Sequence, residues 1–192
     1  MMARISKEPE VRRQEILDTA MQLFYEKGYE KTSITDIAKN MGVAQGLCYR
    51  YFTSKEEIFD TALDQYAQKL VERLTDGILE KPGPLRQIII EMPTFLDVEW
   101  EDSFYYKVCH GSENLKTHSQ LSMRVCEKLM PIIEKVLQRA ALDGEIHIAD
   151  CRVTASFCVY GQLGILLDQT LDGALRVQRI KAFLLKMLGL DA

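Results

Sequence analysis

Apolar residues recur along most of this chain at the three- and four-residue spacing that places them on one face of an α-helix. No stretch of useful length alternates apolar and polar residues, so the pattern predicts helices rather than strands. The predicted helices cover residues 16–24, a segment from Ser54 that ends before Lys81, Leu85–Leu96 with an interruption near Pro93, and the approximate ranges 103–111, 115–142, 150–169 and 173–188. The sequence therefore predicts an all-α fold.

Two short helical patterns joined by a glycine lie between Ser33 and Phe52. The first begins with Ser33 and Asp36, which have the spacing of a capping box. Gly42 ends it, because glycine readily adopts the left-handed conformation that terminates a helix. A second helix is predicted from about Gln45 to Phe52. Two helices joined in this way are typical of the helix-turn-helix motif, whose second helix enters the major groove of DNA.

The second helix carries more bulky side chains than so short a segment can bury. The residues expected to face outward are Gln45, Gly46, Leu47, Tyr49, Arg50 and Tyr51. Amide and guanidinium groups hydrogen-bond base edges or phosphates, tyrosine hydroxyls reach phosphate oxygens, and a leucine can contact a thymine methyl group. Ser54-Lys55-Glu56-Glu57 forms a second capping box, whose N–H groups and lysine would suit a phosphate. The alternative is an ordinary helical hairpin with surface tyrosines.

From Val11 to about Leu70 the order of motifs resembles the DNA-binding domain of the TetR family of bacterial transcriptional regulators. The shared motifs are Ile16–Phe24, Lys27-Gly28-Tyr29, Thr32-Ser33-Ile34, Asp36-Ile37-Ala38, Gly42-Val43, Tyr49-Arg50-Tyr51-Phe52 and Ser54-Lys55-Glu56-Glu57. The resemblance implies that Thr35, Gln45, Gly46, Leu47, Tyr49, Tyr51 and Lys55 lie at DNA-contacting positions.

The same resemblance implies a division into two domains. Residues 10–70 would form the three-helix DNA-binding domain with its helix-turn-helix at 33–52, and residues 71–192 a helical ligand-binding and dimerisation domain. The last two helices would pair with those of a second subunit. The implied protein is a homodimeric repressor that binds a near-palindromic double-stranded operator and is released by a small-molecule inducer.

Two positions depart from the family pattern. Ala44 stands where the family usually has a capping residue, and losing such a cap costs about 1 kcal/mol. Leu47-Cys48 replaces the more usual Thr-Leu pair, which removes a hydroxyl from a position that commonly faces the operator. Operator preference at that contact therefore does not follow from the family.

The segment from Val153 to Leu167 contains no charged residue and is apolar on nearly every face. It is too short to span a bilayer, so burial on all sides is expected and no membrane partner is predicted. Gly161 and Gly164 lie inside it, which predicts either the close approach of another helix or a local kink.

An inducer site is expected among apolar residues of the C-terminal part. The candidate lining residues are Met92, Phe95, Trp100, Phe104, Tyr105, Cys109, Met123, Cys126, Phe157 and Tyr160. Clefts between helices are common sites for apolar or aromatic ligands, although ordinary core packing explains the same residues. The acidic residues around Trp100 would suit a cationic aromatic ligand, but a solvated loop is the favoured interpretation, since charge runs usually lie on the surface.

Composition and charge leave this interpretation unchanged. The net charge is -4, and residues 1–60 carry nearly equal numbers of cationic and acidic side chains, so DNA affinity would depend on where the cations lie. The expected contact cations are Arg4, Lys7, Arg12, Arg13, Arg50 and Lys55.

The five cysteines form no Cys-x-x-Cys pair and are odd in number. They predict a reducing cytoplasm and no disulfide framework. The spacing of Cys109, His110, His118 and Cys126 matches no familiar zinc pattern, so no metal, cofactor or catalytic activity is predicted. Two alternatives stay open. One is a redox-responsive regulator acting through Cys109, Cys126, Cys151 or Cys158, and the other is a helical ligand-binding protein or enzyme without DNA binding.

Overall fold

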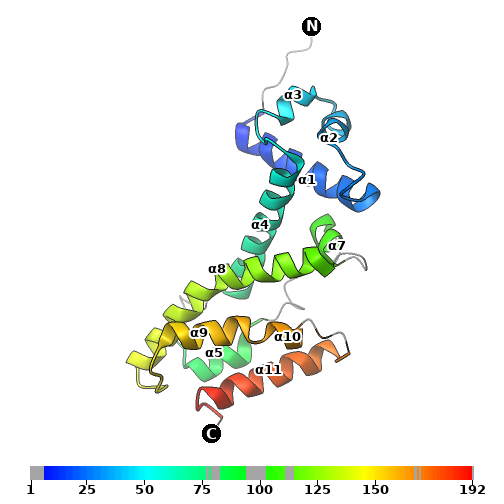
Figure 1. Cartoon of the computed structure of the whole chain (residues 1–192). Helices are drawn as coiled ribbons and strands as arrows, with labels where there is room; N and C mark the ends of the chain where they lie inside the picture. Colours follow the sequence, from blue (N-terminus) through cyan, green and yellow to red (C-terminus); the bar gives the residue numbers. More distant parts are fainter. Residues whose placement is uncertain are drawn as a thin grey trace. The chain divides into compact units, whose positions relative to one another are not determined.

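The computed structural model describes residues 7–76, 78, 83–93, 103–110, 115–166, 168 and 170–191. Within these ranges it contains helices and no strand, which confirms the all-α prediction. The helices are α1 (Pro9–Lys27), α2 (Ile34–Asn40), α3 (Gln45–Cys48), α4 (Lys55–Leu74), α5 (Leu85–Glu91), α7 (Phe104–His110), α8 (Leu115–Leu142), α9 (Cys151–Tyr160), α10 (Leu163–Leu166) and α11 (Gly173–Met187) (Figure 1).

The chain folds into two compact units that do not follow a single cut in the sequence. The N-terminal unit contains the described residues through Tyr66 together with those from Ser103 to Leu121. The C-terminal unit contains the described residues from Ala67 to Pro93 and from Ser122 to Asp191. The predicted functional division at residue 70 stays a prediction, because compactness does not assign a role to either unit.

The core of the N-terminal unit is built around α1. This helix buries Ile16, Leu17, Ala20, Met21, Leu23 and Phe24 along one face, as its apolar spacing predicts. Ile37 from α2, Phe52 from the segment after α3 and Ile58 from α4 pack into the same core. Val108 of α7 joins this core although it lies far along the sequence. The packing of α1, α2 and α4 holds α3 in place.

In the C-terminal unit, polar side chains fix both ends of α5. The Glu145 carboxylate accepts a hydrogen bond from the Leu85 N–H at 2.5 Å. Lys181 Nζ donates to the carbonyls of Ile90 and Met92, at 2.7 and 3.0 Å. The helix ends at Glu91 because Met92 adopts an extended conformation (φ -53°, ψ 126°), which the following proline favours. The remainder of the helix predicted to reach Leu96 lies outside the described residues.

The single helix predicted over 150–169 is wrong, because Gly161 follows the end of α9 and α10 begins at Leu163. A Cβ atom at Gly161 would lie 2.5 Å from the Phe157 carbonyl oxygen, so glycine is required by the chain's own preceding turn. A Cβ atom at Gly164 would meet no described atom within 4 Å. The kink therefore explains Gly161, and no other described part of this chain approaches Gly164 closely.

Burial on all sides of the segment 153–167 is also wrong for the single chain. Val153 is 52% exposed and Phe157 is 69% exposed, although Ala155 and Val159 on the same helix are buried. The two exposed side chains are four residues apart, so they lie on one face of α9. The apolar character of this segment therefore includes an outward face that the chain itself does not cover.

Candidate nucleic-acid interface

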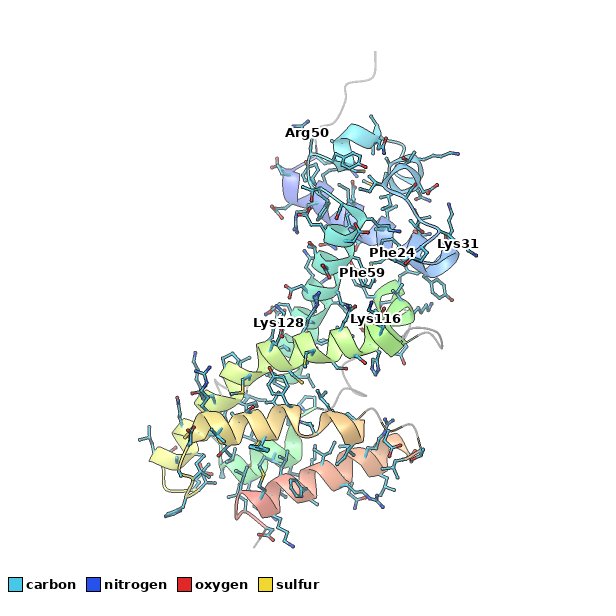
Figure 2. The ribbon with its side chains drawn as sticks, in the orientation of Figure 1. Phe24, Lys31, Arg50, Phe59, Lys116 and Lys128 are labelled. Carbon is cyan, nitrogen blue, oxygen red and sulfur yellow. The ribbon has the colours of Figure 1, made fainter. Side chains whose placement is uncertain are left out.

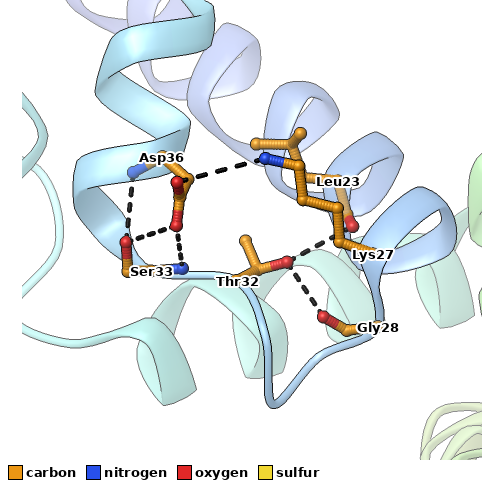
Figure 3. A network of polar contacts seen from close by, with 6 residues as sticks. All are labelled: Leu23, Lys27, Gly28, Thr32, Ser33 and Asp36. Carbon is orange, nitrogen blue, oxygen red and sulfur yellow. Dashed lines mark hydrogen bonds and ion pairs between the residues drawn. The ribbon is translucent and has the colours of Figure 1, made fainter.

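The corner between α1 and α2 is fixed by a buried threonine (Figure 3). Gly28 ends α1 with φ 87°, and its N–H donates to the Phe24 carbonyl. The Thr32 hydroxyl is placed to donate to the carbonyls of Leu23 and Gly28, at 3.3 and 2.9 Å. The Gly28 bond pairs a carbonyl just beyond the end of α1, and the Leu23 bond ties Thr32 to the last turn of that helix. The chain therefore enters α2 in a defined direction.

The predicted capping box at the start of α2 is present. The Asp36 N–H donates to Ser33 Oγ at 3.2 Å, and the Ser33 N–H donates to the Asp36 carboxylate at 2.9 Å. The Ser33 hydrogen bonds and, more weakly, the charges of Lys27 and Lys39 lower the pKa of Asp36 below its ordinary value. The carboxylate therefore stays ionised at neutral pH and satisfies the free N–H group at this helix end.

The turn after α2 has the geometry of a Schellman motif. Gly42 has φ 67°, its N–H donates to the Lys39 carbonyl, and the Val43 N–H donates to the Ala38 carbonyl at 2.9 Å. Val43 packs against the core of the N-terminal unit. The left-handed glycine predicted from the sequence is confirmed, and it turns the chain directly into α3.

The helix α3 is shorter than predicted. It ends at Cys48, and the next residues continue in tight turns in which the Tyr51 and Phe52 N–H groups both donate to the Cys48 carbonyl. Ala44 precedes the helix without a side-chain cap, as its missing hydroxyl requires. Cys48 is fully buried, and this burial raises the pKa of its thiol. Cys48 therefore anchors α3 to the core as a small apolar side chain.

The proposed DNA-contacting residues differ in exposure. Thr35, Gln45, Gly46, Tyr49 and Arg50 are exposed, whereas Leu47, Tyr51 and Lys55 are half-buried. Tyr51 packs against the core of the N-terminal unit, so only part of it faces outward. In the part of the chain that the structure describes, no partner is present for the Arg50 guanidinium. Arg50 follows α3 and its side chain points outward (Figure 2).

The other expected contact cations already have protein partners. Lys7 and Arg12 both pair with Glu15. The Arg13 guanidinium lies 4.9 Å from the centre of the Phe52 ring. Lys55 Nζ donates to the Tyr29 carbonyl at 2.8 Å and lies 4.2 Å from the centre of the Tyr29 ring. Arg4 lies outside the described residues. Among the described cations of this set, Arg50 differs from the others because its guanidinium has no protein partner in the described part of the chain.

Sequence reasoning missed two further exposed cations. Lys31 lies between α1 and α2, and Lys39 lies on the exposed face of α2 one helical turn after Thr35. The exposed positions of α2 at i and i+4 could have identified Lys39 from the sequence.

The start of α4 forms half of the second predicted capping box. The Glu57 N–H donates to Ser54 Oγ at 3.1 Å. The Glu57 carboxylate, however, accepts from the N–H and hydroxyl of Thr53, each at 2.6 Å, and these bonds lower the pKa of Glu57. Thr53 therefore takes the place of Ser54 in the return bond, and the segment between α3 and α4 is tied to the first turn of α4.

The predicted inducer residues are distributed over both units. Phe104, Tyr105 and Cys109 belong to the N-terminal unit. The Tyr105 hydroxyl donates to the Asp18 carboxylate of α1 at 2.8 Å, and its burial, reinforced by this carboxylate, raises the pKa of Tyr105 well above its ordinary range. Tyr105 therefore connects α7 with α1, a contact that local sequence patterns do not encode.

The remaining described candidates lie in the C-terminal unit. Cys126 is buried and donates to the Val159 carbonyl at 3.8 Å, Met92 packs against the core of this unit, and Tyr160 is half-buried. Met123 is 48% exposed and Phe157 is 69% exposed. Phe95 and Trp100 lie outside the described residues. Among the candidates in this unit, Cys126, Met92 and Tyr160 therefore have the burial that an apolar ligand site requires.

The buried thiols have little reactivity in this structure. Burial raises the pKa of Cys126 and of Cys158 to about 11. A thiol must be deprotonated to act as a nucleophile or to react quickly with oxidants. Cys109 is buried as well, whereas Cys151 is half-buried. The redox alternative therefore depends chiefly on Cys151.

Among the described residues, no helix has the length and apolar character needed to cross a membrane. No group of three or more His, Cys, Asp or Glu side chains in the same ranges is placed to hold a metal ion.

Comparison with known proteins identifies a relationship that covers part of α1, all of α2 and α3, and part of α4. Residues 16–62 match the family model described as bacterial regulatory proteins, tetR family. Nucleoid occlusion factor SlmA of Haemophilus influenzae is 26% identical over 153 residues, which cover 77% of this chain and 70% of that protein. The fatty acid metabolism regulator protein of Bacillus subtilis is 26% identical over 136 residues, covering 71% and 63%. The HTH-type transcriptional repressor KstR2 of Mycobacterium tuberculosis is 33% identical over 87 residues, covering 45% and 44%.

Solved structures share the fold over almost the whole chain. Salmonella enterica GusR superposes with a TM-score of 0.67 and 18% identity, covering 95% of this chain and 98% of that chain. A TetR-family regulator from Mesorhizobium loti superposes with a TM-score of 0.66 and 21% identity, covering 96% and 98%.

Proposed function

Since this chain belongs to the TetR family of bacterial transcriptional regulators, we propose that it binds a near-palindromic operator as a homodimer and represses the adjoining genes. The proposal includes release from the operator when a small molecule binds the C-terminal unit. The observation that carries it is the outward surface of α3, which follows a capped α2 and a left-handed Gly42. This combination presents polar side chains on a rigid support, as recognition of base edges requires.

The contacts to DNA follow from side-chain chemistry. Gln45 is the first residue of α3 and is exposed, so its amide suits the paired donor and acceptor of an adenine edge. Arg50 and the Tyr49 hydroxyl suit phosphate oxygens, and Leu47 suits a thymine methyl group. Gly46 lets the backbone approach the groove, while Thr35 and the outer edge of Tyr51 complete the proposed contact set.

Exposed apolar side chains on α9 and α11 support the homodimer. Phe157 of α9 is 69% exposed, and Phe183 and Met187 of α11 are 63% and 39% exposed. Phe183 and Met187 are one helical turn apart, as are Val153 and Phe157, so each helix has an outward apolar stripe. A second copy offers the same two stripes, and a two-fold pairing buries all of them. Phe157 therefore serves this dimer surface rather than an inducer pocket.

A two-fold dimer presents two copies of α3 to DNA, which accounts for the expected palindrome. An inducer that binds more tightly to a conformation with another separation of the two α3 helices shifts the population away from the operator-bound state. Met92, Cys126 and Tyr160 are the described residues that we propose to contact the inducer. An apolar or aromatic small molecule suits them.

Selection from a pool of random double-stranded DNA tests operator binding. The purified protein should enrich inverted repeats, and its affinity for them should fall as salt rises, since phosphate contacts release counterions. Tyr49→Ala should weaken binding about tenfold, because it removes a proposed hydrogen bond to phosphate. Tyr25→Ala is the matched control, since Tyr25 is equally exposed in the same unit but lies outside residues 33–55. Recovery of sequences without a repeat, or equal affinity of both variants, would contradict the proposal.

The ligand response needs its own measurement. A small molecule that raises the melting temperature of the protein should also release the selected operator in fluorescence anisotropy. Saturating binding of such a molecule with unchanged operator affinity would show that the proposed coupling is wrong.

A further inference from the structure

The helix-turn-helix segment is closed at its base by contacts between residues that flank it. Tyr29 precedes α2 and Lys55 begins α4, so residues 33–52 lie between them in the chain. Lys55 Nζ donates to the Tyr29 carbonyl at 2.8 Å and lies 4.2 Å from the centre of the Tyr29 ring. The Lys55 ammonium therefore contacts both the backbone and the ring of Tyr29, and this contact joins the residues before and after the helix-turn-helix segment.

Tyr29 is itself held by its surroundings. Its ring centre lies 5.1 Å from that of Phe24 and 5.1 Å from that of Phe59, the two rings labelled in Figure 2. Its hydroxyl donates to the Glu56 carboxylate at 3.3 Å. Burial, together with the charge of Glu56, raises the pKa of Tyr29 to about 12, so the hydroxyl keeps the proton that it donates. Tyr29 therefore offers a fixed carbonyl and ring face to Lys55.

Lys55 is the first residue of α4, where a positive charge needs a compensating partner. A cation in the first turn of a helix is unfavourable, because the helix dipole places partial positive charge there. The Tyr29 carbonyl and ring offset that cost by accepting the ammonium. Arg50, in contrast, points away from the protein without a partner among the described residues. The two cations therefore have different environments although both follow α3 within seven residues.

We propose that Tyr29, Lys55 and Glu56 form a clamp that fixes the α2–α3 segment in its DNA-binding orientation, and that Lys55 acts on operator affinity through Tyr29 rather than through a phosphate. This proposal rests on the proposed operator binding. It assigns Lys55 the role of a positioning residue and leaves Arg50 as the phosphate contact. Ordering the segment before DNA arrives reduces the entropy lost on binding, which is how such a clamp raises affinity.

Salt dependence separates the two roles of a cation. The logarithm of the binding constant falls linearly with the logarithm of the salt concentration. Each side chain that neutralises a phosphate contributes about 0.9 to the magnitude of this slope, and here a lowered slope means a smaller magnitude. Lys55→Met should reduce operator affinity about tenfold at every salt concentration and leave the slope unchanged. Arg50→Met is the matched control, since it removes a cation without a protein partner and should lower the slope by about 1. A lowered slope in Lys55→Met, or unchanged affinity, would overturn the clamp.

A double-mutant cycle tests the connection with Tyr29. Tyr29→Leu removes the ring and hydroxyl, and the clamp predicts that Lys55→Met adds little further loss of affinity in this background. Additive losses would mean that the two residues act independently and would overturn the proposal. Lys55→Arg should retain operator affinity within about twofold, because a guanidinium can also contact the carbonyl and ring of Tyr29. If Tyr29→Leu does not fold, the salt slopes of the Lys55 and Arg50 variants still decide the question.

Hydrogen exchange in the DNA-free protein distinguishes failure of the clamp from failure of the proposed function. Amides of residues 33–52 should exchange about tenfold faster in Lys55→Met than in the unchanged protein, because local opening becomes easier. Arg50→Met should leave these rates unchanged. Absence of operator binding by the unchanged protein would refute the proposed function, whereas equal exchange in all three proteins would refute the clamp.

Discussion

The core around α1 and the outward faces of α9 and α11 differ in how much apolar surface the single chain can bury. Ile37 and Phe52 in the first region are 0% and 1% exposed, whereas Phe157 and Phe183 in the second are 69% and 63% exposed. The first region is thus complete within one chain. The second resembles half of a core, since fully covering a phenylalanine contributes about 1.5–3 kcal/mol that the chain alone does not gain. The surface proposed for DNA recognition and the surface proposed for assembly therefore lie on different elements.

The strongest way to break the complete region is to open a cavity in it. Ile37→Ala should lower the free energy of unfolding by about 2–5 kcal/mol, because Ile37 is fully buried and its neighbours cannot collapse completely. Urea unfolding at a fixed protein concentration measures the change. Lys39→Ala on the exposed face of the same helix should change stability by less than about 0.5 kcal/mol. Equal losses in the two variants would contradict the burial assigned to α2.

A charge on the second region should separate the subunits without unfolding them. Phe157→Glu should raise the dimer dissociation constant about 100-fold, since it places an unpaired carboxylate in a surface that dimerisation would bury. Sedimentation velocity over a range of concentrations measures this effect. Val11→Glu is the control, because Val11 is 51% exposed on α1, a helix that is not part of the proposed dimer surface. An unchanged dimer in Phe157→Glu would exclude α9 from the interface.

A smaller change should strengthen the first region at its uncapped helix. Ala44 has φ -71° and ψ 140°, a conformation in which a serine side chain can cap α3 by accepting from the Leu47 N–H. Ala44→Ser should therefore raise the free energy of unfolding by about 0.5–1 kcal/mol. Ala44→Val, which has no acceptor, should not. Loss of stability in the serine variant would show that the start of α3 is constrained by something other than its cap.

The smallest expected effect is on the stability of the protein at acidic pH. The pKa of Asp36 is lowered in the folded protein, so its contribution to stability is present above the unfolded value of 3.8 and is lost as pH falls through the folded value. Unfolding at about pH 6 and about pH 3 should show a larger acid-induced loss in the unchanged protein than in Asp36→Asn. The asparagine can still accept the Ser33 N–H but does not titrate. Identical losses would mean that the capping box does not contribute to this pH dependence.

Local signals predicted much of the candidate interface. The capping box of Ser33 and Asp36 and the left-handed Gly42 involve partners within six residues of one another, so the sequence contains all the groups that form them. Ala44 likewise predicted an uncapped α3. The end of α3 at Cys48 was missed, because helix length depends on how Cys48 and Phe52 pack into the core.

Contacts between distant residues could not be predicted in the same way. Tyr105 was expected to line an inducer site, yet its hydroxyl donates to Asp18, which lies 87 positions earlier. Phe157 was expected to be buried and is exposed, because the apolar face of α9 exceeds what the chain can cover. Apolarity predicts that a side chain avoids water but does not specify which element covers it.

The sequence by itself determined the helical class, most helix starts and the turn between α2 and α3, because helix periodicity and capping are interactions between near neighbours. Only the tertiary structure decided that α7 joins the N-terminal unit and that Lys55 meets Tyr29. Residues 26 and 87 positions apart come together only when the chain has folded. Their contacts depend on the path of the whole chain, which no short stretch of sequence specifies.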